Sequence, residues 1–149
     1  MNSETLVGAD LTAEIVHDIF EGIFVDAKLT TDNNNPEDSE CVLDFDGQKV
    51  VIRISKPPIG QVRMTSAWGV DPNVSETTVL NAVNDRNGYS FHRAELHTWK
   101  DGTRSILFDY YWIYPPVFDK RILVKIVREF ASDVWRAVRS KEIQAVLEE

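Results

Sequence analysis

The stretch from Val79 to Trp112 constrains the fold most, because it reads as the end of a helix followed by a β-hairpin. Its first residues repeat at helical spacing up to Asn87-Gly88, and glycine is preferred in the left-handed position just past a helix end. Two strand-like runs follow, near 89–99 and 104–113, and the Asp101-Gly102 pair between them is a strong hairpin turn signal. The stretch therefore predicts a fold that mixes helices with antiparallel strands.

The chain before this stretch adds one helix and a meander of strands. Apolar residues recur at helical spacing over 12–25, and alternation of apolar and polar residues then predicts strands. Asp46-Gly47 marks a second hairpin turn. The patterns predict strands at 26–31, 41–46, 49–55 and 61–67, with a polar loop at 32–39.

Two further helices complete the prediction. Ser75 is a suitable N-cap for the helix that ends at Asn87, and a long amphipathic helix is expected to start at Pro115-Pro116. Beyond Ser140 the apolar phase shifts, so 139–149 is either a bend or a separate short helix, and 1–10 is expected to be frayed. We predict one α+β domain over 1–149, with an antiparallel sheet of five to six strands in the order α-β-β-β-α-β-β-α and helices packed mainly on one face.

Charge and composition exclude several classes of function. The 149 residues carry a net charge of −8, and residues 1–48 alone hold 12 acidic side chains against the single base Lys28. An acidic protein repels phosphate backbones, so we expect no nucleic-acid partner. No run approaches the roughly 18 apolar residues that span a bilayer, and the single Cys41 cannot form an internal disulfide. We expect a cytoplasmic protein with no membrane contact.

The sequence shows no pattern for catalysis or metal binding. It contains neither a phosphate-binding glycine loop nor a nucleophile elbow. His92 and His97 stand five apart in one predicted strand, so they point to opposite faces and cannot chelate one metal. His17 has no zinc-motif spacing around it. We therefore expect no cofactor, no metal and no enzyme activity.

The face of the predicted sheet turned away from the helices mixes apolar and charged side chains. Such half-apolar faces are typical of protein-binding surfaces. We expect aromatic and aliphatic residues to contact a protein partner, on this face or along the long C-terminal helix, and arginines at the rim to add selectivity. The candidate contact residues are Arg53, Arg63, Phe91, Arg93, Trp99, Leu107 and Tyr111.

Two alternatives stay open at this point. One is a small-molecule-binding or enzymatic domain with a pocket between the helix ending at Asn87 and the sheet, near Asn84 and His92. The other is a structural protein that only self-associates, as a homodimer. For Asn84 and Asn87 a local role is favoured, because amides near helix ends usually serve local hydrogen bonds.

The segments 82–87 and 89–94 resemble the YbjN-like family, which is assigned to sensory-transduction regulation in bacteria. That family carries a V-N-x-x-N helix end, an aromatic-x-R-A strand and a D-G hairpin, and the element order resembles the type III secretion chaperone-like fold. The resemblance implies a non-catalytic regulator or chaperone-like module. The matching positions are Val83, Asn84, Asn87, Phe91, Arg93, Ala94, Asp101 and Gly102.

Overall fold

The computed structural model describes residues 4–30, 39–88 and 92–148. Its helices and strands follow the predicted order closely, with additions at both ends. A 3-10 turn at Gly8–Asp10 precedes the first helix. The helices are α1 (Ala13–Glu21), α2 (Glu76–Asn87), α3 (Lys120–Val138) and α4 (Lys141–Gln144), and the strands are β1 (Thr5–Val7), β2 (Asp26–Thr30), β3 (Glu40–Phe45), β4 (Gln48–Ser55), β5 (Gln61–Gly69), β6 (Arg93–Thr98), β7 (Arg104–Ile113) and β8 (Val117–Asp119).

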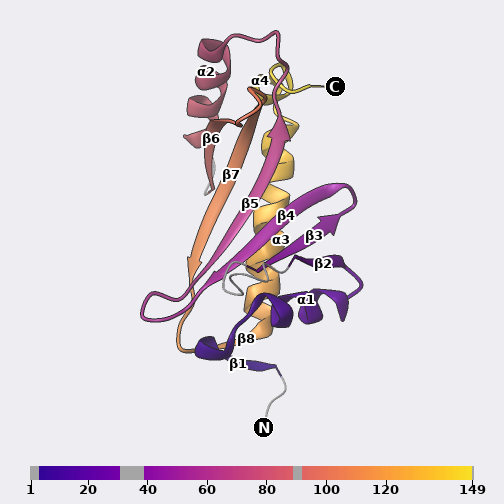
Figure 1. Cartoon of the computed structure of the whole chain (residues 1–149), viewed down its shortest axis with the longest axis vertical. Helices are drawn as coiled ribbons and strands as arrows, with labels where there is room; N and C mark the ends of the chain where they lie inside the picture. The colour runs from indigo at the N-terminus through magenta and orange to yellow at the C-terminus, as the bar shows by residue number, and fades with distance from the viewer. Residues whose placement is uncertain (1–3, 31–38, 89–91, 149) are drawn as a thin grey trace.

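A six-stranded antiparallel sheet in the order β2-β3-β4-β5-β7-β6 forms the centre of the molecule, which confirms the predicted α+β class. In Figure 1 the strands pass in front of α3, while α2 and α4 lie near one end and α1, β1 and β8 near the other. Helix α3 contacts β4 and β5, and α1 contacts β2 and β3. The sheet therefore has one face covered by helices and one open face.

The covered face is apolar because the strands alternate as the sequence predicts. Val62 and Met64 of β5 and Phe108 of β7 are fully buried, and the register pairs Val62 with Trp112 and Met64 with Tyr110. Helix α3 is amphipathic and turns its apolar stripe toward this face. The stripe consists of Leu123, Val127, Phe130, Val134 and Val138.

Local signals fix the element ends. The Ser75 side chain accepts a hydrogen bond from the Thr78 amide at 3.2 Å, so the predicted cap of α2 is confirmed. The expectation of a left-handed glycine after this helix is wrong, because Gly88 has φ −74°. Left-handed backbone occurs instead in the predicted hairpin turns, at Gly47 (φ 96°) and Gly102 (φ 87°).

The structure differs from the prediction at both ends of the sheet region. Residues 5–7 are not frayed, because β1 pairs with β8 to form a separate two-stranded sheet. The long helix begins at Lys120, capped by the Asp119 carboxylate, rather than at Pro116. The pairing of β1 with β8 joins segments more than 100 residues apart, which a local sequence pattern cannot reveal. After Ser140 a separate short helix, α4, follows.

Candidate functional site

The open face of the sheet brings most of the predicted contact residues together. Strand alternation places Arg53 of β4, Arg63 of β5, Arg93 of β6, and Leu107 and Tyr111 of β7 on this face. The register sets Arg63 opposite Tyr111 on the neighbouring strand. These residues come from four strands that run side by side, so the face presents one continuous surface.

A buried carboxylate lies at the centre of the open face. Asp109 is 4% exposed, and its Oδ1 accepts hydrogen bonds from the Thr65 hydroxyl at 2.8 Å and from Arg63 Nη2 at 3.2 Å. Arg93 stands opposite Asp109 across the β6–β7 pair and donates to Glu95 at 2.7 Å. The bond to Glu95, aided by the charge of Asp109, raises the pKa of Arg93 above its ordinary value.

Two exposed aromatic side chains lie on the same face, Tyr111 beside this polar centre and Trp99 at the hairpin end of β6. Tyr111 is 45% exposed, and the Arg63 guanidinium lies 5.4 Å from its ring centroid. Trp99 is 43% exposed, donates its indole N–H to Ser105 Oγ at 2.9 Å, and packs edge to face on the His97 ring at 4.4 Å. A hollow of about 600 Å³ lies beside it, lined by residues 97–101. Both rings are thus held in place while offering apolar area.

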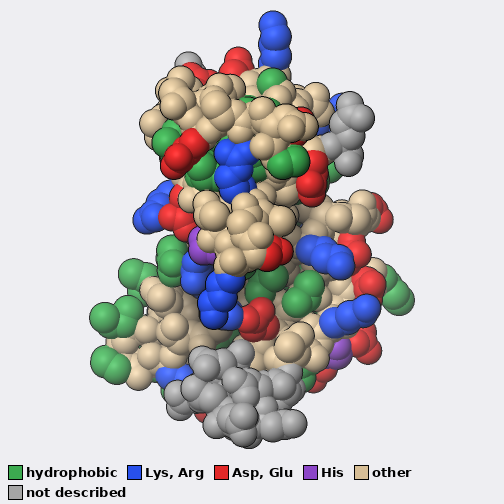
Figure 2. Space-filling view, turned by 45° about the horizontal axis from the view of Figure 1, so that its top comes forward, with side chains coloured by type: hydrophobic (Ala, Val, Ile, Leu, Met, Phe, Trp, Pro, Cys, Tyr) green, Lys and Arg blue, Asp and Glu red, His purple; other side chains and the backbone are tan. Residues whose placement is uncertain are grey.

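The remaining predicted contact residues contribute less surface or lie elsewhere. Leu107 is only 8% exposed, so it offers little area to a partner. Arg53 is exposed but lies toward the β3 side of the face, where it pairs with Glu40. Phe91 lies outside the described residues. Figure 2 shows this side of the molecule with blue, red and green side chains interspersed rather than gathered into a field of one charge.

The family-motif residues build the junction between α2 and β6. Val83 and Ala94 are buried. The Asn87 amide donates to the Ala94 carbonyl at 2.9 Å and accepts from the Ala94 amide at 2.7 Å. Asn87, rather than Asn84, therefore ties the helix end to the hairpin, and Asn84 is exposed on α2.

His92 does not line an open pocket with Asn84. It is 2% exposed, its Nδ1 is hydrogen-bonded to the Asp133 carboxylate, and its ring packs edge to face on Phe108 and Phe130. Burial lowers the pKa of His92 more than the nearby Asp133 charge raises it. The structure buries Asp133, although its neighbours in the sequence of α3 give no sign of this.

The described residues give no support for metal or thiol chemistry. Across residues 4–30, 39–88 and 92–148, no three His, Cys, Asp or Glu side chains are grouped so that they could hold a metal ion. Burial raises the pKa of the Cys41 thiol to about 12, so the reactive thiolate does not form at neutral pH.

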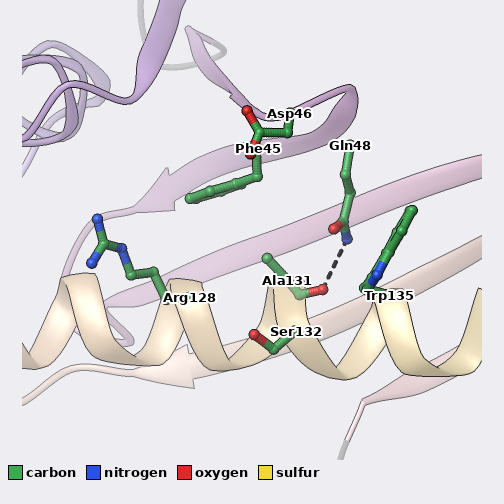
Figure 3. Close-up of a pocket in the computed structure, with 7 residues that line it drawn as sticks. All are labelled: Phe45, Asp46, Gln48, Arg128, Ala131, Ser132 and Trp135. Carbon is green, nitrogen blue, oxygen red and sulfur yellow. Dashed lines mark hydrogen bonds between the residues drawn. The ribbon is translucent and has the colours of Figure 1, made fainter.

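A second concave region was not predicted. It lies on the covered side, between the β3–β4 turn and the middle of α3, and includes Phe45, Arg128 and Trp135 (Figure 3). Its residues come from two segments of sequence, 45–48 and 128–135, that lie far apart in the chain. Neither segment by itself indicates a concavity.

Comparison with known proteins relates the fold, rather than the sequence, to solved structures. No protein-family model and no curated protein matches the chain. YbjN from E. coli, a proposed transcription regulator, superposes with a TM-score of 0.71 at 10% identity, over 93% of this chain and 97% of that one. The fold is YbjN-like. An uncharacterised protein from Methanothermobacter thermautotrophicus superposes with a TM-score of 0.63 at 12% identity, over 91% and 98% of the two chains.

The YbjN-like fold confirms the resemblance noted in the sequence and covers nearly the whole chain. At such low identity the similarity concerns architecture, so functional argument depends on this chain's own side chains. Within the described part of the chain, no helix is both long enough and apolar enough to cross a membrane.

Proposed function

We propose that the protein is a non-catalytic cytoplasmic regulator that binds another protein through the open face of its sheet. The observation that carries the proposal is that two exposed, fixed aromatic rings, Trp99 and Tyr111, lie on the same face as the Arg63–Asp109 centre. Aromatic side chains and arginine are the groups that most often dominate binding energy at protein interfaces.

Fixed side chains favour binding because less conformational freedom is lost on association. The Trp99 ring is held by Ser105 and His97, and the Tyr111 ring lies against Arg63. Ordering a side chain costs roughly 0.5–1.5 kcal/mol when it is free beforehand. These rings therefore present apolar area at a reduced entropic cost.

The charge arrangement on this face favours a protein over a nucleic acid. Each of the three predicted arginines already has an acidic partner on the same face: Arg53 with Glu40, Arg63 with Asp109, and Arg93 with Glu95. Cations neutralised in this way do not provide the positive field that phosphate backbones need. Balanced pairs at a rim instead select partners by complementary charge.

Alanine variants with a matched control test the proposal. Trp99→Ala removes an exposed ring from the open face, and Trp135→Ala removes one of nearly equal exposure, 45%, from the helical side. Each purified variant would be crosslinked in lysate of its own host, and the captured proteins identified by mass spectrometry.

We expect Trp99→Ala and Tyr111→Ala to lose a captured protein that Trp135→Ala retains. Equal capture by all three variants would rule out the open face as the binding surface. Native mass spectrometry of the same samples separates the homodimer alternative, because in that case the only species lost from the Trp99→Ala sample is a second copy of the chain.

A further inference from the structure

A groove of about 520 Å³ lies on the helical side of the sheet, between the β3–β4 turn and the middle of α3. In Figure 3 the α3 backbone forms its floor, with Phe45 reaching over the helix from the turn and Trp135 rising from the helix at the other end. The lining residues are Phe45, Asp46, Gln48, Arg128, Ala131, Ser132 and Trp135. The groove is thus aromatic at two sides and polar between them.

The walls of this groove are fixed by aromatic contacts outside it and by one hydrogen bond between two of its lining residues. Phe45 packs edge to face on Phe20 at 6.3 Å, and Trp135 packs on Trp68 at 6.3 Å. The buried Gln48 side chain donates through Nε2 to the Ala131 carbonyl at 3.0 Å, a bond drawn in Figure 3. A site whose walls are held before binding loses little freedom when a ligand enters.

Arg128 differs from the other cations of α3. Those have partners: Lys120 with Glu4, Arg121 with Asp119, Lys125 with Glu129, and Arg136 with the Ser132 carbonyl. Among the residues that the structure describes, Arg128 has neither an ion pair nor a hydrogen bond from its side chain. An unpaired guanidinium that lines a preformed aromatic groove is a ready donor for a carboxylate.

We propose that this groove binds a small organic monoanion, a carboxylate attached to an aromatic or branched aliphatic body. The carboxylate pairs with Arg128 through two parallel N–H bonds, and the apolar body lies between Phe45 and Trp135. Ser132 and Gln48 offer further polar atoms along the floor. Asp46 at the rim repels a second negative charge, which selects monoanions over dianions and phosphates.

This inference is independent of the proposed function, because the groove and the open face lie on opposite sides of the sheet. A different tryptophan also provides the signal for each site, since Trp135 lies in the groove and Trp99 on the open face. A ligand in the groove leaves the protein-binding face accessible, so the two sites can be tested separately.

The test uses two probes with the same apolar body, N-acetylphenylalanine as the anion and N-acetylphenylalaninamide as its neutral counterpart. Each is titrated to millimolar concentration into the full chain, and the indole N–H signals of its four tryptophans are followed by NMR. We expect the anion to shift the Trp135 signal and leave Trp99 unchanged. The amide is expected to bind at least tenfold more weakly, because it cannot form the charge-assisted hydrogen bonds that the carboxylate makes with Arg128.

Two variants sharpen this test. Arg128→Gln should weaken binding of the anion about tenfold, while Lys125→Gln, a matched change one turn away on an exposed and paired lysine, should leave it unchanged. Asp46→Asn should not weaken binding, because it removes a repelling charge.

Three results would overturn the proposal: no shift of Trp135 at millimolar anion, equal binding of acid and amide, or equal loss in the Arg128 and Lys125 variants. A third probe, N-acetyl-Gly-Gly-Phe, separates a free acid from a chain terminus. We expect it to bind no more tightly than N-acetylphenylalanine, and markedly tighter binding would assign the groove to a peptide end instead.

Discussion

On the open face of the sheet, Asp109 is buried beneath Arg63 and Thr65, whereas on the covered face Asp133 is buried against the His92 ring. The first carboxylate has a partner that is always charged and that keeps a third of its side chain in water. The second has a partner that titrates and is fully enclosed. The open face can therefore lose or gain polar contacts without disturbing the core, while on the covered face protonation of a buried histidine is coupled to folding.

The largest difference in stability is expected between alanine variants of two aromatic residues on β7, Phe108 and Tyr111. Phe108→Ala opens a cavity on the covered face and should lower the free energy of unfolding by about 3–5 kcal/mol. Tyr111→Ala on the open face should lower it by less than about 1 kcal/mol, because the ring is half exposed. Urea denaturation of both variants measures the difference. Similar losses of unfolding free energy in the two variants would show that the open face contributes to stability as well as to partner binding.

A smaller difference in stability is expected between alanine variants of the two buried acids, Asp133 and Asp109. Asp133→Ala leaves His92 enclosed without its carboxylate, and we expect a loss of about 2–3 kcal/mol. Asp109→Ala leaves Arg63 able to turn to water, so about 1–2 kcal/mol should be lost. If Asp109→Ala lowers the free energy of unfolding more than Asp133→Ala in the same denaturation assay, the Arg63–Asp109 centre contributes to stability as the His92–Asp133 contact does.

The dependence of stability on pH should show the contribution of His92, the partner of Asp133 that titrates. The pKa of His92 is lower in the folded protein than its ordinary 6.5, so the unfolded chain binds the proton more tightly. Stability should therefore fall as pH drops from 6.5 toward the folded pKa, by at most about 1.4 kcal/mol per pH unit for one proton. His92→Gln should flatten that part of the profile of unfolding free energy against pH.

His17 provides the control for this profile, because its pKa is shifted the other way. Its bond to Asp18, aided by Glu21, raises the pKa of His17 above 6.5. The stability that this pair contributes is complete below pH 6.5 and is lost as pH rises through the folded pKa. His17→Gln should therefore lower stability by a constant amount below pH 6.5, leave the acid-side slope unchanged, and remove the decline above pH 6.5. Flattening in both variants would contradict the assignment.

The smallest effect is expected at the exposed pair of the open face. Arg93→Gln removes an ion pair with Glu95 in which the arginine is mostly in contact with water, so the change in stability should be the smallest of the variants compared. If the face binds a partner, the same variant should slow association at low salt, measured by stopped flow with the captured protein. A large loss of stability would place Arg93 among the structural residues.

The sequence predicts those features that local patterns encode. Period-two alternation in β4, β5 and β7 identifies the covered face, and the Asp46-Gly47 and Asp101-Gly102 turns set the hairpins. The open-face arginines follow from the same alternation. Their position could be predicted, but the acidic partner of each depends on register across neighbouring strands.

The remaining features depend on contacts between distant segments. Asp133 looks solvated in its own helix, and only His92, 41 residues away, explains its burial. The β1–β8 pair is six residues joined across the whole chain, too short for a pattern. The groove beside Arg128 combines a turn, a strand start and a helix face, so no single segment signals it.

The Asn87 side chain acts in place of a missing neighbour strand. In an antiparallel strand the N–H and C=O of one residue point to the same side, and at Ala94 both are bonded to the Asn87 amide. The outer edge of β6 is therefore blocked where it begins. An extended segment from another molecule could add to this edge only after displacing that amide, which protects the sheet from growing by strand addition at this end.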